Sequence, residues 1–251
     1  MPEFERFRLI SCAVFTRELC AAVASSNRVV DPEFLELAAH VDTNKLRDLV
    51  QASIDKAEGK GYSAVLLGYG LCGNGLAGIR ARSIPLVLPR AHDCCTIFLG
   101  STDGFVQEFG ESPSAPWSSC GYVERSADYM HRVDEGRESG FGLEMAELVE
   151  KYGEENAAYL WETLHPEADE PVRRFIELEP TEHLGRAEMV KAEAIADGKE
   201  FRLIRGDPKL LRDLVLGPWD DERFLAVAPG HTIQPRYDFK HVFDAVPAQP
   251  L

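Results

Sequence analysis

Short, uninterrupted apolar runs separated by helical patterns are the feature that most restricts how this chain can fold. Three such runs lie at 8–14, 63–70 and 84–90, and none shows the polar alternation of a half-exposed strand. Between the first two, the segment 43–61 carries apolar residues at helical spacing and ends on glycines. Strands that are apolar throughout are typical of parallel sheets covered on both faces. The first half of the chain is therefore predicted to be an α/β unit.

A second alternating set follows in the C-terminal half. Strands are expected at 173–180, 199–206 and 223–230, with helices at 182–198 and 208–217 between them. The predicted fold is α/β, with one or more mostly parallel, doubly wound sheets, in which two similar β-α-β-α-β halves surround a helical middle.

The middle of the chain is less regular. The segment 101–126 is rich in Ser, Gly and Pro and is predicted to be a long loop, and two helices are expected within 140–164. We expect an N-terminal α/β lobe over 1–125 that carries a cysteine site. The remainder, 126–251, then forms a helical segment and a C-terminal α/β lobe, unless the whole chain is one continuous domain.

The net charge of −15 over 251 residues restricts the partners of the protein. Binding to nucleic acid or anionic membranes requires clustered Lys and Arg, and the sequence has no such cluster. The apolar runs are shorter than the roughly 20 residues that span a bilayer, and the charged N-terminus is not that of a signal peptide. We therefore expect no nucleic acid, no membrane and a cytoplasmic location, where the six cysteines stay reduced.

Cysteines follow three successive predicted strands. Cys12, Cys72 and Cys94 each lie at or just after a carboxyl end, the edge at which open α/β sheets bind ligands. A lone Cys is often a packing residue, and we interpret Cys20, on a predicted helix, in this way. Of the adjacent Cys94 and Cys95, one sulfur is expected to point into the site and the other into the core. Three thiols at one edge instead suggest a shared site for zinc or a [4Fe–4S] cluster. Three protein ligands leave one position open, as in catalytic metal sites.

Other residues near these thiols suit accessory roles. His92, Asp93 and Arg90 flank Cys94 and are the candidate catalytic residues, because they can ligate, shuttle protons or hold an anion. The fourth ligand is left open among Cys120, His92, His231 and none. His231 would reach the same edge if the last strand continues the sheet.

The string "GYGLCGNG" predicts a close approach of the backbone to a bulky ligand. Its candidate cofactor-binding residues are Gly70, Gly73, Asn74 and Gly75. It matches a dinucleotide fingerprint only weakly, since its strand is not the first and a cysteine stands where a pyrophosphate would approach.

The motifs together resemble the uncharacterised family called domain of unknown function 1638, found in bacteria and methanogenic archaea. The strings that carry the resemblance are "LISCAVFTREL", "VLLGYGLCGNGLAGI", "LVLPRAHDCCTIFLGS", "YGEENAAYLWETL" and "DLVLGPWDDERFLAVAPGHTI". The resemblance implies site cysteines at Cys12, Cys72 and Cys94, which leaves Cys95 as the packing residue. It also implies an association with corrinoid-dependent methyltransferase systems, and hence a corrinoid cofactor or a methyltransferase or corrinoid protein as partner. This sequence departs from the family pattern at Gly121-Tyr122, where Gly-Trp is usual, and at "FIELEP".

Three functional hypotheses remain at this point. The first is a metal-dependent transferase or lyase, or an accessory protein, with a three-thiolate site that acts on a small-molecule ligand in methyl or alkyl transfer. The second is a non-catalytic module that binds or delivers a metal, cluster or corrinoid. The third is a metal-free enzyme whose nucleophile, Cys94, is activated by His92 and a helix N-terminus.

Overall fold

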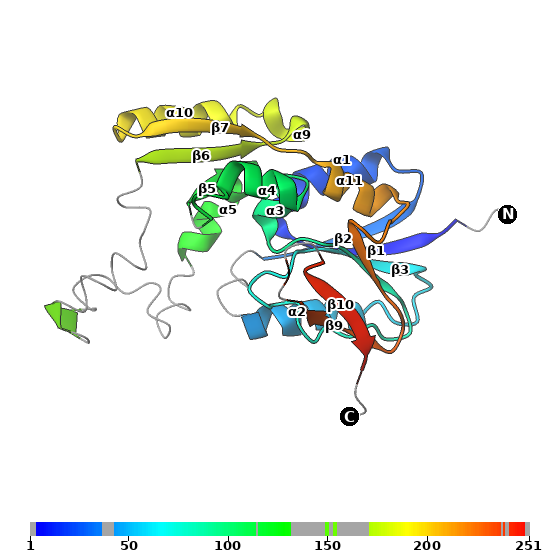
Figure 1. Cartoon of the computed structure of the whole chain (residues 1–251). Helices are drawn as coiled ribbons and strands as arrows, with labels where there is room; N and C mark the ends of the chain where they lie inside the picture. Colours follow the sequence, from blue (N-terminus) through cyan, green and yellow to red (C-terminus); the bar gives the residue numbers. More distant parts are fainter. Residues whose placement is uncertain are drawn as a thin grey trace.

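A five-stranded sheet forms the centre of the computed structural model (Figure 1). Its strand order is β2-β1-β3-β4-β8, and the first four strands are parallel. The strands are β1 (Arg6–Cys12), β2 (Val29–Leu35), β3 (Ala64–Gly68), β4 (Leu86–Pro89) and β8 (Phe224–Val227). The structure describes residues 4–36, 43–113, 115–131, 149–150, 153–154, 171–236, 238 and 241–248.

Helices cover both faces of this sheet. The short 3-10 helix η1 (Ala13–Phe15) leads from β1 into α1 (Thr16–Ser25), which lies with α11 (Lys209–Leu216) on one face. The opposite face carries α2 (Thr43–Asp55) and the antiparallel pair β9 (His231–Pro235) and β10 (Phe243–Pro247) (Figure 1). Because both faces are covered, every residue of β3 and β4 is buried, which explains why these strands are apolar throughout.

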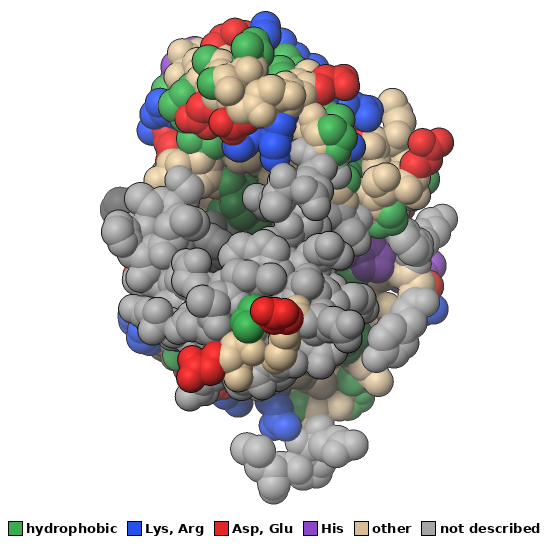
Figure 2. All heavy atoms as spheres, turned by 90° about the vertical axis from the view of Figure 1, so that its left-hand side faces the viewer, with side chains coloured by type: hydrophobic (Ala, Val, Ile, Leu, Met, Phe, Trp, Pro, Cys, Tyr) green, Lys and Arg blue, Asp and Glu red, His purple; other side chains and the backbone are tan. Residues whose placement is uncertain are grey.

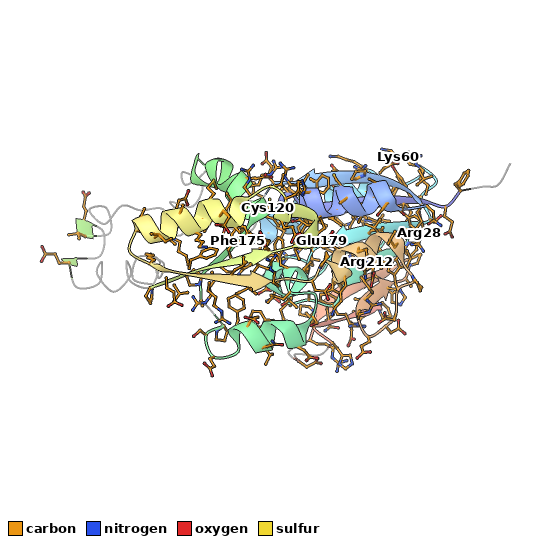
Figure 3. All side chains as sticks on the ribbon, turned by 90° about the horizontal axis from the view of Figure 1, so that it is seen from above. Arg28, Lys60, Cys120, Phe175, Glu179 and Arg212 are labelled. Carbon is orange, nitrogen blue, oxygen red and sulfur yellow. The ribbon has the colours of Figure 1, made fainter. Side chains whose placement is uncertain are left out.

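A smaller parallel sheet forms a second layer. Its order is β5-β6-β7, from β5 (Trp117–Ser119), β6 (Val172–Glu177) and β7 (Glu200–Arg205). Seen from above, α10 (Arg186–Ala196) lies over this sheet beside Phe175 (Figure 3). Phe175 forms a small hydrophobic core with Ala187 and Val190 of this helix. The connecting helices are α3 (Cys94–Phe98), α4 (Thr102–Phe109), α5 (Cys120–His131) and α9 (Glu179–Glu182).

The surface of this second layer carries charges of both signs. On the face shown in Figure 2, acidic and basic side chains are intermixed over its described part. One such pair, between Arg202 of β7 and Glu108 of α4, is 2.7 Å long. This intermixing differs from the single-sign surface typical of a nucleic-acid interface.

The α/β class and the mostly parallel central sheet are confirmed, whereas the repeat of two similar halves is not. The strand expected at 223–230 joins the first sheet and runs antiparallel to β4, with Pro89 opposite Phe224. The segment 101–126 is not one long loop, because it contains α4, β5 and the start of α5. The two helices expected within 140–164 lie almost wholly outside the described residues, and the boundary at residue 125 stays a prediction.

No helix in the described part of the chain has the length and apolar character needed to cross a membrane.

Candidate functional site

The strand order places a topological switch point at the carboxyl ends of β1 and β3. From β1 the chain continues to β2 on one side, and it then returns to β3 on the other side. Open α/β sheets bind ligands in the crevice at such a point. Cys12 is the last residue of β1, Cys72 follows β3 and Cys94 follows β4, so all three thiols belong to this edge.

Cys12 is buried where β1 passes into η1. Burial raises the pKa of its thiol from 9.0 to about 11. The backbone N–H groups of Val14 and Ala13 and the charge of Arg125 act in the opposite direction, because they favour the thiolate. Burial therefore favours the neutral thiol of Cys12, although nearby backbone N–H groups could donate hydrogen bonds to its thiolate.

Cys72 lies in a loop with an unusual backbone. Its φ is +48°, and those of Gly73 and Asn74 are +61° and +71°, so three successive residues are left-handed. A left-handed conformation is costly for a cysteine and persists only where the surroundings impose it. Here the Leu71 N–H donates to the Ala91 carbonyl and the Cys72 N–H to the His92 carbonyl, both at 2.9 Å. Burial raises the pKa of Cys72 well above its usual value, and Cys94 and Cys12 raise it further.

Cys94 is the first residue of α3. Asp93 caps this helix by accepting from the Thr96 N–H at 2.9 Å and from its hydroxyl at 3.0 Å. The Cys94 Sγ lies 2.9 Å from the Tyr122 hydroxyl, and either group can donate. Burial raises the pKa of Cys94 to about 12, while the hydrogen bond to Tyr122 lowers it. The next residue, Cys95, lies in the hydrophobic core.

The three thiols form one electrostatic cluster with two tyrosines. Cys12 and Cys94 both act on Cys72, and all three thiols raise the pKa of Tyr122 after its own burial. The pKa of Tyr69, which follows β3, is likewise raised first by burial and then by Cys12 and Cys72. We call these five residues the thiol cluster. Within the described residues, no set of three or more His, Cys, Asp or Glu side chains is arranged to hold a metal ion.

The residues flanking Cys94 have separate positions. The His92 backbone carbonyl binds the Cys72 loop, and Asp93 is committed to the helix cap. Arg90 instead donates to the backbone carbonyls of Asp221, His241 and Phe243 at 2.6–2.8 Å. Its guanidinium thus anchors the C-terminal segment, and these contacts do not direct it to the thiols.

The glycines of the "GYGLCGNG" string allow this loop to pack closely against its neighbours. A Cβ on Gly70 would lie 2.8 Å from the Ala91 carbonyl oxygen and from the Asp93 nitrogen, and one on Gly75 would lie 2.6 Å from Leu46 of α2. Gly73 and Asn74 are exposed in the left-handed turn. The close backbone approach at Gly70 is therefore to the neighbouring loop.

The candidate fourth ligands Cys120 and His231 lie elsewhere. Burial raises the pKa of Cys120 to about 11, and the charged neighbours that act on it are Glu124, Glu18, Arg17 and Arg186, none of which is in the cluster. His231 does not reach the edge with the thiols, because β8 is antiparallel to β4. Its carboxyl end, Val227, pairs with Leu86 at the start of β4, so His231 follows the opposite edge of the sheet.

Tyr122 and Tyr69 are the cluster members that sequence reasoning missed. Tyr122 packs edge-on against Trp117, with ring centroids 5.1 Å apart. Its hydroxyl contacts Cys94, which is 28 residues earlier in the chain. The departure from the family pattern at Gly121-Tyr122 was the one signal that pointed to it. Tyr69 looked like part of an ordinary apolar strand end.

A family model described as "Protein of unknown function (DUF1638)" matches residues 34–178, which is more than half of the chain. The match includes Cys72, Cys94 and Tyr122, whereas Cys12 precedes it. No curated protein and no solved structure matches the chain.

Proposed function

Because the chain belongs to the DUF1638 family, for which no activity is given, we propose its function from the thiol cluster. The proposed function is to bind a thiophilic metal, as zinc or a [4Fe–4S] cluster, through Cys12, Cys72 and Cys94. The protein acts as an enzyme or accessory protein in methyl or alkyl transfer. We place it in the cytosol, where thiols stay reduced.

The observation that supports this proposal is that three thiols lie at the same edge of the sheet, at the switch point. The order β2-β1-β3-β4 with helices on both faces supports a doubly wound sheet, in which this crevice is the ligand site. Sulfur ligands select soft metals such as zinc and iron–sulfur clusters. The backbone N–H groups beside Cys12 and the Tyr122 hydroxyl beside Cys94 supply the hydrogen bonds that metal-bound thiolates accept.

The raised thiol pKa values favour a metal over a metal-free nucleophile. Burial raises the pKa of Cys12 and of Cys94 to about 11 and about 12, so both are neutral near pH 7. A reactive cysteine requires a lowered pKa. A metal cation deprotonates the thiols that bind it. Since the described side chains form no ready ligand set, we expect metal uptake to rearrange the cluster and to release its protons.

The chemistry of such a site follows from its ligand number. Three protein ligands leave one position for a substrate, and zinc held by thiolates activates a sulfur nucleophile for alkyl transfer. The link to corrinoid-dependent methyl transfer rests on the family resemblance.

Metal analysis of cysteine variants tests this proposal. We expect anaerobically purified protein to carry zinc, or to show the broad absorbance of an iron–sulfur cluster at about 400 nm. Cys12→Ser, Cys72→Ser and Cys94→Ser should each lose most of the metal, because a hydroxyl is a poor ligand at a soft site. Cys20→Ser, which changes an exposed thiol, and Cys95→Ser, which changes a core thiol, should retain it. A metal-free parent protein, or variants that all bind metal like the parent, would contradict the proposal.

A further inference from the structure

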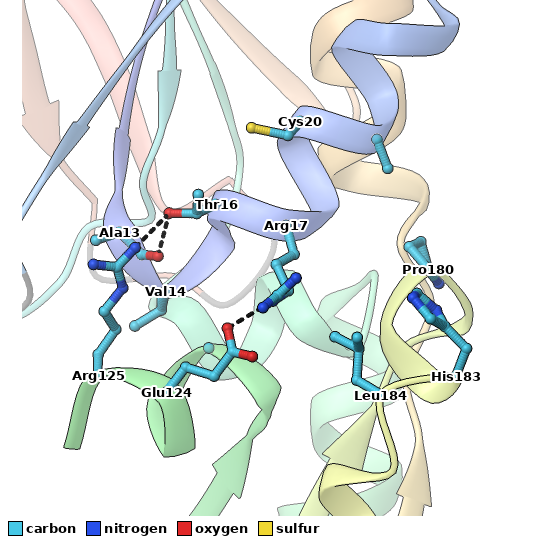
Figure 4. A pocket seen from close by; sticks show the side chains of 12 residues that line it. Ala13, Val14, Thr16, Arg17, Cys20, Glu124, Arg125, Pro180, His183 and Leu184 are labelled. Carbon is cyan, nitrogen blue, oxygen red and sulfur yellow. Dashed lines mark hydrogen bonds and ion pairs between the residues drawn. The ribbon is translucent and has the colours of Figure 1, made fainter. Parts of the chain in front are cut away.

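A groove of about 450 Å³ lies between three walls (Figure 4). One wall is formed by η1 and α1, a second by α5, and a third by α9 and the turn after it. Polar side chains line it, among them Thr16, Arg17, Cys20, Glu124 and Arg125.

The groove adjoins the proposed metal site. Ala13 and Val14, whose N–H groups favour the Cys12 thiolate, both line it, as does Gly121, which precedes Tyr122. Cys12 directly precedes Ala13 in the chain and is itself buried, so the groove runs along the backbone that follows this thiol. A molecule in the groove would therefore lie against Ala13 and Val14, next to the segment that holds Cys12.

Positive charge exceeds negative charge along the groove, although the whole chain carries −15. Glu124 is shared by two guanidinium groups, those of Arg17 at 2.6 Å and Arg186 at 3.1 Å. Among the described residues, Arg125 has no carboxylate partner, and its one hydrogen bond, to the Thr16 hydroxyl, is 3.5 Å long. The nearby carboxyl of Glu18 is buried, and burial raises its pKa to about 7, so it is partly neutral at that pH.

We propose that this groove binds a small molecule carrying a carboxylate, phosphate or similar oxyanion, held by the guanidinium of Arg125; the Thr16 hydroxyl, which donates to the Ala13 carbonyl at 2.6 Å, accepts from Arg125 and orients it. A guanidinium presents paired donors that match such groups. The uncharged remainder of the molecule extends past Ala13 and Val14 toward Cys12. The inference deepens the proposed function, on which it rests, by naming the substrate class of the same site.

Titration of the metal-free protein with inorganic phosphate and with acetate tests the groove directly, using amide chemical shifts in ¹H–¹⁵N spectra. We expect saturable shifts at residues lining the groove. Arg125→Gln should weaken binding about tenfold or more, because a charge-assisted hydrogen bond is lost, and Arg125→Lys should weaken it less. Arg82→Gln is the matched control. Arg82 pairs with Asp55 of α2, on the opposite face of the sheet, and its loss should change affinity less than twofold.

The outcomes separate this inference from the metal proposal. The absence of saturable shifts with both anions, or equal weakening by Arg125→Gln and Arg82→Gln, overturns the anion site whatever metal the protein holds. Anion binding that depends on Arg125 in a protein that takes up no metal supports the groove and contradicts the metal proposal instead.

Discussion

At the scale of single residues, the site depends on what surrounds each thiol. Cys94 and Cys95 are neighbours in the sequence, yet Cys94 contacts the Tyr122 hydroxyl and Cys95 lies in the core. The helix cap formed by Asp93 fixes this difference, because it sets the register of α3. The Tyr122 hydroxyl is a side-chain hydrogen-bond partner of the Cys94 thiol, at 2.9 Å.

Tyr122→Phe should slow the alkylation of Cys94 by iodoacetamide in the metal-free protein. The hydrogen bond from Tyr122 lowers the Cys94 pKa, so its loss raises that pKa and reduces the thiolate fraction, by roughly tenfold for about one unit. The rate is measured from pH 8 to 10 by peptide mass spectrometry. Tyr62→Phe, which removes a hydroxyl bonded to Asp31 at 2.8 Å, is the control. An unchanged or faster reaction of Cys94 would mean that Tyr122 does not support its thiolate.

At the scale of elements, the close contact between α5 and η1 assembles the site. A Cβ on Gly121 would lie 1.8 Å from the Val14 carbonyl oxygen, so only glycine allows α5 to begin here. This contact brings Tyr122 to Cys94 and also forms one side of the groove.

Gly121→Ala should destabilise the protein by about 3 kcal/mol or more, since backbone would have to move to relieve the clash. Gly185→Ala is the control, because Gly185 has a φ of +64° but no atom within 4 Å of an added Cβ. It should cost only about 1 kcal/mol for the left-handed conformation. Urea denaturation measures both. Equal costs for the two variants would show that the α5–η1 contact adjusts easily.

The same elements show what a sequence can predict. β3 and β4 are buried along their whole length, so their apolar runs identified them. β2 was missed because it is an edge strand that includes Asp31, Pro32 and Glu33, residues that central strands exclude. The direction of β8 was not predictable, because a four-residue apolar run is the same in parallel and antiparallel pairing.

At the scale of the whole molecule, a buried carboxyl joins the two layers. Glu18 of α1 is 4% exposed and lies close to Thr181 of α9, which affects its pKa. Its Oε2 atom has no hydrogen-bond partner within the described residues. Burial raises the pKa of Glu18 from 4.5 to about 7, and the charge of Glu124 adds to this effect, while Arg17 and the Thr181 hydrogen bond oppose it.

The contribution of Glu18 to the stability of the fold should therefore fall as pH rises from 4.5 to about 7. A raised folded-state pKa means that the native state holds the Glu18 proton between pH 4.5 and about 7. This contribution is complete below the lower value and is lost above the higher one. Glu18→Gln, which stays neutral, should be more stable than the parent at pH 8 by up to about 3 kcal/mol. Chemical denaturation from pH 5 to 8.5 measures this difference.

Glu188→Gln, on the exposed surface of α10, should stay within about 0.5 kcal/mol of the parent at each pH. If Glu18→Gln behaved like this surface variant, the buried carboxyl would not control how stability varies with pH.

The late position of β8 in the chain has a consequence for synthesis on the ribosome. β4 gains its neighbour β8, and Arg90 gains its carbonyl acceptors, only when the C-terminal segment emerges; Arg90 and Asp221 are 131 residues apart. At about 5–20 residues per second, that interval is roughly ten seconds. During it, the nascent chain exposes an unpaired strand edge next to the thiol cluster. Translation rate and early chaperone contact should therefore influence how much of this protein folds correctly.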